Sequence, residues 1–123
     1  MTNYIDGFVL PIPEKHLETY KSVSETGANV WKEHGALAYN EFVGDDMSLE
    51  GTRSFLESTN AKSDEVIIFG WVEFDSKESR DLANERVASD PRMTDIIAPL
   101  VIPTQIIFDP KRMVFGGFKP LVQ

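Results

Sequence analysis

The stretch EVIIFGWVEF, residues 65–74, constrains the architecture more strongly than any other segment, because it is apolar on both faces. A strand with one wet face alternates apolar and polar residues. Here both parities are apolar, with Val66, Ile68, Val72 and Phe74 on one and Ile67, Phe69 and Trp71 on the other. We therefore expect a strand that needs a cover on each side.

Apolar runs and their proline or glycine boundaries predict the other elements. We predict strands at 4–10, 36–46 and 112–122, helices over 13–34 and 76–90, and a long polar loop over 45–64. The order β-α-β-β-α-β indicates an α+β, ferredoxin-like chain in which both helices cover one face of a four-stranded antiparallel sheet. The other face stays open. Two copies packed sheet to sheet would bury it, so we expect a homodimer formed through the strand at 65–74.

Two local features need a physical reason. Gly27 lies inside the predicted first helix, where glycine costs on the order of 1 kcal/mol relative to alanine. We expect close packing of the helix on the sheet to explain it. The segment 96–108 is strongly apolar but is interrupted by Pro99 and Pro103. We expect it to fold over the protomer edge or onto the partner, as a pocket wall near Trp31 and His34 or as a structural seal.

Length and composition limit the classes of function. The 123 residues predict one domain, 1–123, with 20 Asp and Glu against 12 Lys and Arg. The net charge of −8 and the lack of a basic stripe argue against binding nucleic acid. The absence of cysteine fits a cytoplasmic location. We find no signal peptide and no apolar run of membrane-spanning length, so we expect no membrane partner.

Several motifs together resemble a known group of proteins. They are YIDGFVLPIP, VWKEHGALAYNEFVGDD, GWVEF, SKESRDLANERVASDPRM and FDPKRMVFGGF, and they span nearly the whole chain. The chain resembles an uncharacterised bacterial domain-of-unknown-function family of the dimeric α+β-barrel superfamily. The resemblance implies a ferredoxin-like protomer and a homodimer whose sheets pack into a barrel. It implies no particular activity.

The candidate acid–base residues are His34 and Asp6. His34 ends the predicted first helix on the same face as Trp31, where it serves either as a catalytic base or as a helix cap. Asp6 interrupts an apolar strand. A carboxylate facing a barrel interior has a raised pKa and can act as a base, whereas one at a strand end only reaches water or an ion-pair partner such as Arg112. The same alternatives apply to Glu41 and Glu73.

The candidate pocket residues are mainly aromatic, and their alternative role is ordinary core packing. They are Phe8, Trp31, Tyr39, Glu41, Phe69, Trp71 and Glu73. We expect neither a metal nor a cofactor. The adjacent acids Asp45 and Asp46 lack the spaced ligand set of a calcium loop, and the glycine pair at 116–117 lacks the context of a nucleotide-binding loop.

Three hypotheses for the function follow from these features. The first is a homodimer that binds a small apolar molecule in a sheet–helix or barrel cavity. The second is a cofactor-independent isomerase or monooxygenase-like enzyme that uses His34 or Asp6 as its base. The third is a purely structural or protein-interaction dimer. A cavity of roughly 300 Å³ or more favours the first two hypotheses over the third.

Overall fold

Four strands form one antiparallel sheet in the computed structural model, which describes residues 2–123. The strands are β1 (Tyr4–Pro13), β2 (Ala38–Val43), β3 (Glu65–Phe74) and β6 (Val114–Phe118), in the spatial order β2-β3-β1-β6. β3 and β1 are therefore the inner strands, and they pair along their whole length from Tyr4 opposite Phe74 to Pro13 opposite Glu65. This arrangement confirms the predicted ferredoxin-like sheet.

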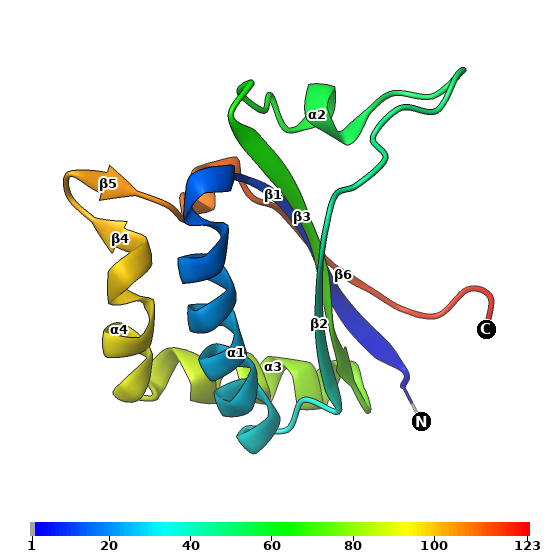
Figure 1. Cartoon of the computed structure of the whole chain (residues 1–123). Coiled ribbons are helices and arrows are strands. Elements are labelled where there is room, and N and C mark those ends of the chain that lie inside the picture. The colour runs from blue at the N-terminus through cyan, green and yellow to red at the C-terminus, as the bar shows by residue number, and fades with distance from the viewer. Residues whose placement is uncertain (1) are drawn as a thin grey trace.

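Three helices lie on the same side of the sheet (Figure 1). They are α1 (Leu17–Glu33), α3 (Lys77–Ser89) and α4 (Arg92–Ile97). Ser76 caps α3, because its side-chain oxygen accepts a hydrogen bond from the Ser79 backbone N–H at 3.0 Å. The helices thus leave the opposite face of the sheet without a helical cover of comparable size.

The first helix begins later than the sequence pattern predicts. Pro13 is the last residue of β1, with an extended backbone (φ −61°, ψ 127°), and not the first turn of a helix. A short 3₁₀ turn, η1 (Glu14–His16), separates it from α1. The fixed φ of proline suits both an extended residue and a first helical turn, so the sequence does not distinguish them. Here pairing with Glu65 extends the strand.

The hydrophobic core lies between the sheet and the helices. Leu10, Ile12 and Ile68 are almost completely buried there and pack near Tyr20 of α1. A second cluster of buried residues contains Ala36, Val72, Phe74 and Ala83. The even-numbered residues of β1 and β3 share the helix side of the sheet, because residues directly opposite in an antiparallel pair lie on one face. This assigns one of the two apolar faces of β3.

The other face of the sheet is apolar and largely open. Phe42 is 60% exposed, Phe69 44% and Phe118 57%, and Trp71 is half-buried. Register places these residues on the face opposite the helices. The short helix α2 (Phe55–Ser58) lies at one end of this face, where Phe55 makes an edge-to-face contact with Phe69. Most of the aromatic surface remains uncovered within the protomer.

The apolar segment 96–108 folds back onto its own protomer. After α4 it forms a 3₁₀ turn, η2 (Ala98–Leu100), and a small hairpin of β4 (Val101–Ile102) and β5 (Gln105–Ile106). Leu100 and Ile107 are buried in the core, and the Leu100 carbonyl accepts hydrogen bonds from the Ile107 and Phe108 N–H groups. Figure 1 shows this segment beside α1, and its buried residues Leu100 and Ile107 close the edge of the core there.

Several boundaries differ from those predicted. β2 and β6 are shorter than the predicted 36–46 and 112–122, and a third short 3₁₀ turn, η3 (Pro110–Arg112), precedes β6. The explanation for Gly27 is wrong: a Cβ built on this residue would meet nothing within 4 Å. No helix within residues 2–123 combines the length and apolar character needed to cross a bilayer.

Candidate functional site

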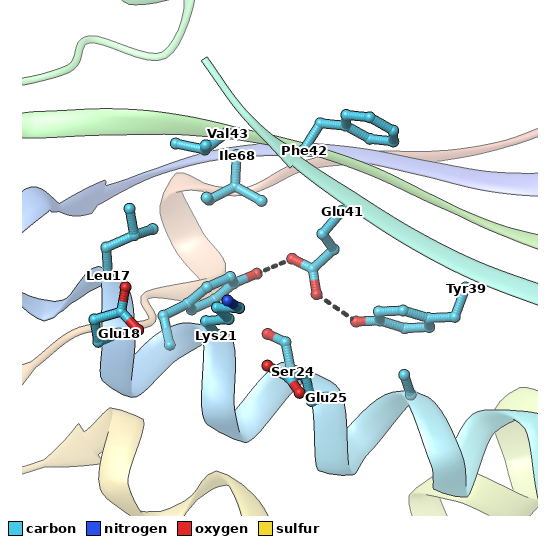
Figure 2. Close-up of a pocket in the computed structure, with 12 residues that line it drawn as sticks. Leu17, Glu18, Lys21, Ser24, Glu25, Tyr39, Glu41, Phe42, Val43 and Ile68 are labelled. Carbon is cyan, nitrogen blue, oxygen red and sulfur yellow. Dashed lines mark hydrogen bonds between the residues drawn. The ribbon is translucent and has the colours of Figure 1, made fainter. Parts of the chain in front are cut away.

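A cleft of about 670 Å³ lies between α1 and the edge strand β2. One wall comes from α1 and the other from β2, with Ile68 of β3 behind them (Figure 2). The lining residues are Leu17, Glu18, Tyr20, Lys21, Ser24, Glu25, Ala28, Tyr39, Glu41, Phe42, Val43 and Ile68. Most of the surface that these residues present is apolar. The cleft exceeds the roughly 300 Å³ typical of small ligand sites.

Glu41 is the polar centre of this cleft. It extends from β2 towards α1, as Figure 2 shows. Its two oxygens accept hydrogen bonds from the hydroxyl groups of Tyr20 and of Tyr39, the latter at 2.8 Å. Burial, and then the negative charge of Glu41, raise the pKa of both tyrosines. Both phenols therefore stay protonated, and the remaining lone pairs of the carboxylate can accept further hydrogen bonds.

A second cavity of about 380 Å³ lies on the same side of the sheet, beneath α3. Tyr20 and Tyr39 line both cavities, so they form the wall between the two. The full lining set is Asp6, Phe8, Tyr20, Trp31, Tyr39, Val72, Asn84, Val87, Ala88, Phe108, Met113 and Phe115. Phe108 shows that the apolar segment 96–108 does contribute to a pocket wall together with Trp31.

Asp6 is the buried acid of this second cavity. It is only 2% exposed, and its Oδ1 lies 3.5 Å from the Arg80 Nε without a hydrogen bond. Burial raises the pKa of Asp6, while the charge of Arg80 and the amide of Asn84 oppose that shift. Arg80 instead donates a hydrogen bond to the Tyr4 hydroxyl at 2.9 Å. Asp6 is thus buried on the helix side of the sheet and lies within ion-pair distance of Arg80, so it combines features of the two predicted alternatives.

His34 occupies a different place from Asp6. Its Nε2 lies 2.8 Å from Asp90 Oδ2, and Asp90 also accepts hydrogen bonds from Arg92. Arg92 in turn contacts Glu33 at the end of α1. The network joins the C-terminal ends of α1 and α3. His34 is not among the residues that line either cavity.

The remaining candidate residues lie on the open face of the sheet. Phe69, Trp71 and Glu73 lie on the open face, away from both cavities. Glu73 accepts hydrogen bonds from Thr2 at 2.6 Å and from the Trp71 indole at 3.0 Å, and these bonds lower its pKa. Among residues 2–123, no cluster of three or more histidine or acidic side chains is arranged to hold a metal ion.

Sequence reasoning missed several of the polar or aromatic residues that line the cavities, among them Tyr20, Asn84 and Phe108. Tyr20 is part of the apolar stripe of α1, which predicts core packing and gives no sign of its bond to Glu41. Asn84 lies next to buried Ala83 and one turn before buried Val87. An amide in that position signals an inward-facing polar group. Phe108 follows an irregular segment whose path the pattern does not determine.

Comparison with known proteins gives a family match over most of the chain. The family model described as "Protein of unknown function (DUF1428)" matches residues 3–109. The protein described as "Uncharacterized protein YbaA" from Escherichia coli K12 is 34% identical over 119 residues, which cover 97% of each chain. The protein of that name from Shigella flexneri matches to the same degree.

Solved structures share the fold at low sequence identity. A NIPSNAP family protein of unknown function from Agrobacterium tumefaciens aligns with a TM-score of 0.57 and 16% identity, over 97% of this chain and 88% of that one. An uncharacterized NIPSNAP domain protein from Burkholderia xenovorans aligns with a TM-score of 0.55 and 10% identity, over 96% and 94%. At these identities the likeness concerns the fold alone.

Proposed function

We propose that this chain, which belongs to the DUF1428 family, binds a small, largely apolar molecule in its larger cleft. The molecule carries a hydrogen-bond donor. Membership of the family confirms the resemblance seen in the sequence and leaves the activity open. The observation that carries the proposal is Glu41, held by two tyrosine hydroxyls inside an otherwise mainly apolar cleft.

The class of ligand follows from the polar groups at the centre of the cleft. Tyr20 and Tyr39 already donate their protons to Glu41, so this cluster has acceptor capacity to spare. A ligand hydroxyl, amine or amide N–H would complete it, while the apolar walls would bury the rest of the molecule. Neither Asp6 nor His34 lines this cleft. The proposal for the cleft is therefore binding and includes no proton transfer by these predicted bases.

The test uses a neutral fluorescent probe, N-phenyl-1-naphthylamine, which is apolar and carries one N–H donor. We expect a saturable fluorescence increase with a Kd in the range of about 1–100 μM. Ser24→Trp would fill the cleft and abolish the increase. Ser22→Trp is the matched control, because Ser22 is exposed on the same helix and lines neither cavity.

A third variant tests the hydrogen bond itself. Glu41→Gln keeps the side-chain shape but removes the charge of the acceptor, so we expect the affinity to fall about fivefold or more. Absence of probe binding by the folded parent, or unchanged binding by Ser24→Trp, would overturn the proposal. Circular dichroism of each variant separates loss of binding from loss of fold.

We further propose that the protein functions as a homodimer formed through its open sheet face. This face presents Phe42, Phe69, Trp71 and Phe118, and the acid at its edge, Glu73, is occupied by internal donors. An apolar surface of this kind matches a second copy of itself related by a two-fold axis. Most residues that line the two cavities lie on the other side of the sheet, and among residues 2–123 only Phe42, on the edge strand β2, belongs both to the open face and to the lining of the larger cleft.

A further inference from the structure

The smaller cavity contains buried polar atoms for which the fold provides no hydrogen-bond partner. They are Asp6 Oδ1 and Asn84 Oδ1, both without a partner in the structure. Both residues line the cavity. Asp6 is 2% exposed, so bulk water does not compensate its carboxylate. A buried acceptor without a partner is uncommon in folded proteins and marks a position where a further donor is favourable.

The surroundings of these two acceptors are mainly aromatic. Phe8, Trp31, Phe108 and Phe115 line the same cavity, whose volume is about 380 Å³. Flat apolar walls favour a flat apolar molecule, because aromatic rings gain from edge-to-face and stacked contacts. The volume suits a ligand of one or two rings.

The charged groups close to Asp6 determine which kind of hydrogen-bond donor a ligand needs at this position. Arg80 lies on one side with its Nε 3.5 Å from Asp6 Oδ1 and 3.3 Å from Asp81 Oδ1, and its Nη2 donates a hydrogen bond to the Tyr4 hydroxyl. Arg80 therefore already provides a positive charge beside Asp6, and it shares that charge with Asp81. A neutral N–H or O–H donor is sufficient.

We propose that the smaller cavity is a separate binding site for a small neutral aromatic molecule with an N–H or O–H donor, which hydrogen-bonds to Asp6 and Asn84. This site does not depend on the proposed function of the larger cleft. Its walls include residues of α3, β1 and β6, none of which lines the larger cleft. Tyr20 and Trp31 of α1, Tyr39 of β2 and Val72 of β3 also line the smaller cavity. Tyr20 and Tyr39 separate the two.

The experiment compares two ring systems of almost the same shape. Indole carries an N–H donor, and benzofuran has an oxygen in its place. We expect calorimetry to give a Kd for indole below about 1 mM and an affinity about tenfold higher than that for benzofuran. In ¹⁵N-labelled protein, indole should shift the side-chain N–H signal of Trp31, which lines the cavity, and leave that of Trp71 on the open face unchanged.

Variants locate the site and its acceptors. Ala88→Phe would fill the cavity and abolish binding of both compounds, whereas Ser89→Phe, at the exposed neighbouring position of α3, should bind normally. Asp6→Asn and Asn84→Leu should each reduce the preference for indole while leaving benzofuran binding nearly unchanged. Two different substitutions test the hydrogen bonds, so that a folding defect in one variant does not decide the test of the proposal.

Three results would overturn this proposal. They are the absence of binding of either compound by the folded parent, equal affinities for the two compounds, or unchanged indole binding by Ala88→Phe. Ser24→Trp, which blocks the larger cleft, should leave indole binding intact. The experiments therefore test the proposal for the larger cleft separately from the proposal for the smaller cavity.

Discussion

Phe42 of β2 and Trp71 of β3 stack face to face on the open side of the sheet, with ring centroids 5.4 Å apart and an interplanar angle of 4°. Phe69 adds an edge-to-face contact to Trp71 at 6.1 Å. Stacking protects part of each ring but leaves the outer surface in water, since Phe42 remains 60% exposed. The aromatic row is therefore ordered before any partner covers it, which reduces the entropy cost of association.

The first prediction concerns this row. Trp71→Glu places a charge within the proposed interface, where desolvation of an unpaired carboxylate is costly. We expect the parent to be a dimer in sedimentation velocity experiments at about 100 μM, and the variant to be a monomer under the same conditions. Val101→Glu is the control, because Val101 is an exposed apolar residue on β4, on the helix side of the molecule. A monomeric parent, or a dimeric Trp71→Glu, would refute the interface.

The second prediction concerns the contact between His34 and Asp90. Hydrogen bonds from Arg92 and then from His34 lower the pKa of Asp90 in the folded state. A lowered folded pKa stabilises the fold above the unfolded value of about 4, and this contribution is lost as the pH falls through the folded value. We expect Asp90→Asn to lower the melting temperature at pH 7 and to differ progressively less from the parent at acidic pH.

Asp45→Asn is the control for this comparison, since Asp45 is exposed in the loop after β2. Its melting temperature should follow that of the parent across the same pH range. A difference between Asp90→Asn and the parent that grows towards low pH would contradict the prediction.

The third prediction concerns Asp6, whose pKa shifts in the opposite direction. Burial raises it, so the folded protein holds a proton on Asp6 at pH values where the unfolded chain has lost it. Ionisation of Asp6 therefore costs stability as the pH rises above about 4. Asp6→Asn removes this cost. We expect its free energy of unfolding, relative to that of the parent, to increase from pH 4 to pH 8 in urea titrations; a constant or falling difference would contradict the assignment.

The two apolar faces of β3 were the most informative feature of the sequence, and they led to the correct sheet. The Ser76 cap of α3 and the positive φ of Gly35 after α1 are local features, which depend on only a few neighbouring residues. The cavities depend on contacts between distant residues. The bond from Tyr20 to Glu41 spans 21 positions, and the hydrogen bond from His34 to Asp90 spans 56. Periodicity places such residues on a face but does not specify their partners.

The last prediction compares two glycines with opposite surroundings. Gly70 of β3 lies directly opposite Phe8 of β1, whose ring covers it. A Cβ at Gly70 would clash with the Phe8 ring and would approach the Asn40 carbonyl oxygen to 2.9 Å. The Phe8 ring, which lines the smaller cavity, would have to move to make room, and the Asn40 carbonyl belongs to the backbone of β2. We expect Gly70→Ala to destabilise the protein by about 1–3 kcal/mol.

Gly27→Ala is the matched substitution in α1. A Cβ there meets nothing within 4 Å, and alanine reduces the conformational freedom of the unfolded chain. We expect this variant to be more stable than the parent by about 0.5–1 kcal/mol. Urea denaturation measures both variants. Each substitution adds one methyl group, so stability changes of opposite sign in the two variants reflect the different surroundings of the two glycines. Stabilisation by Gly70→Ala would show that Phe8 does not pack on β3. The contribution of Phe8 to the wall of the smaller cavity would then have to be reassigned.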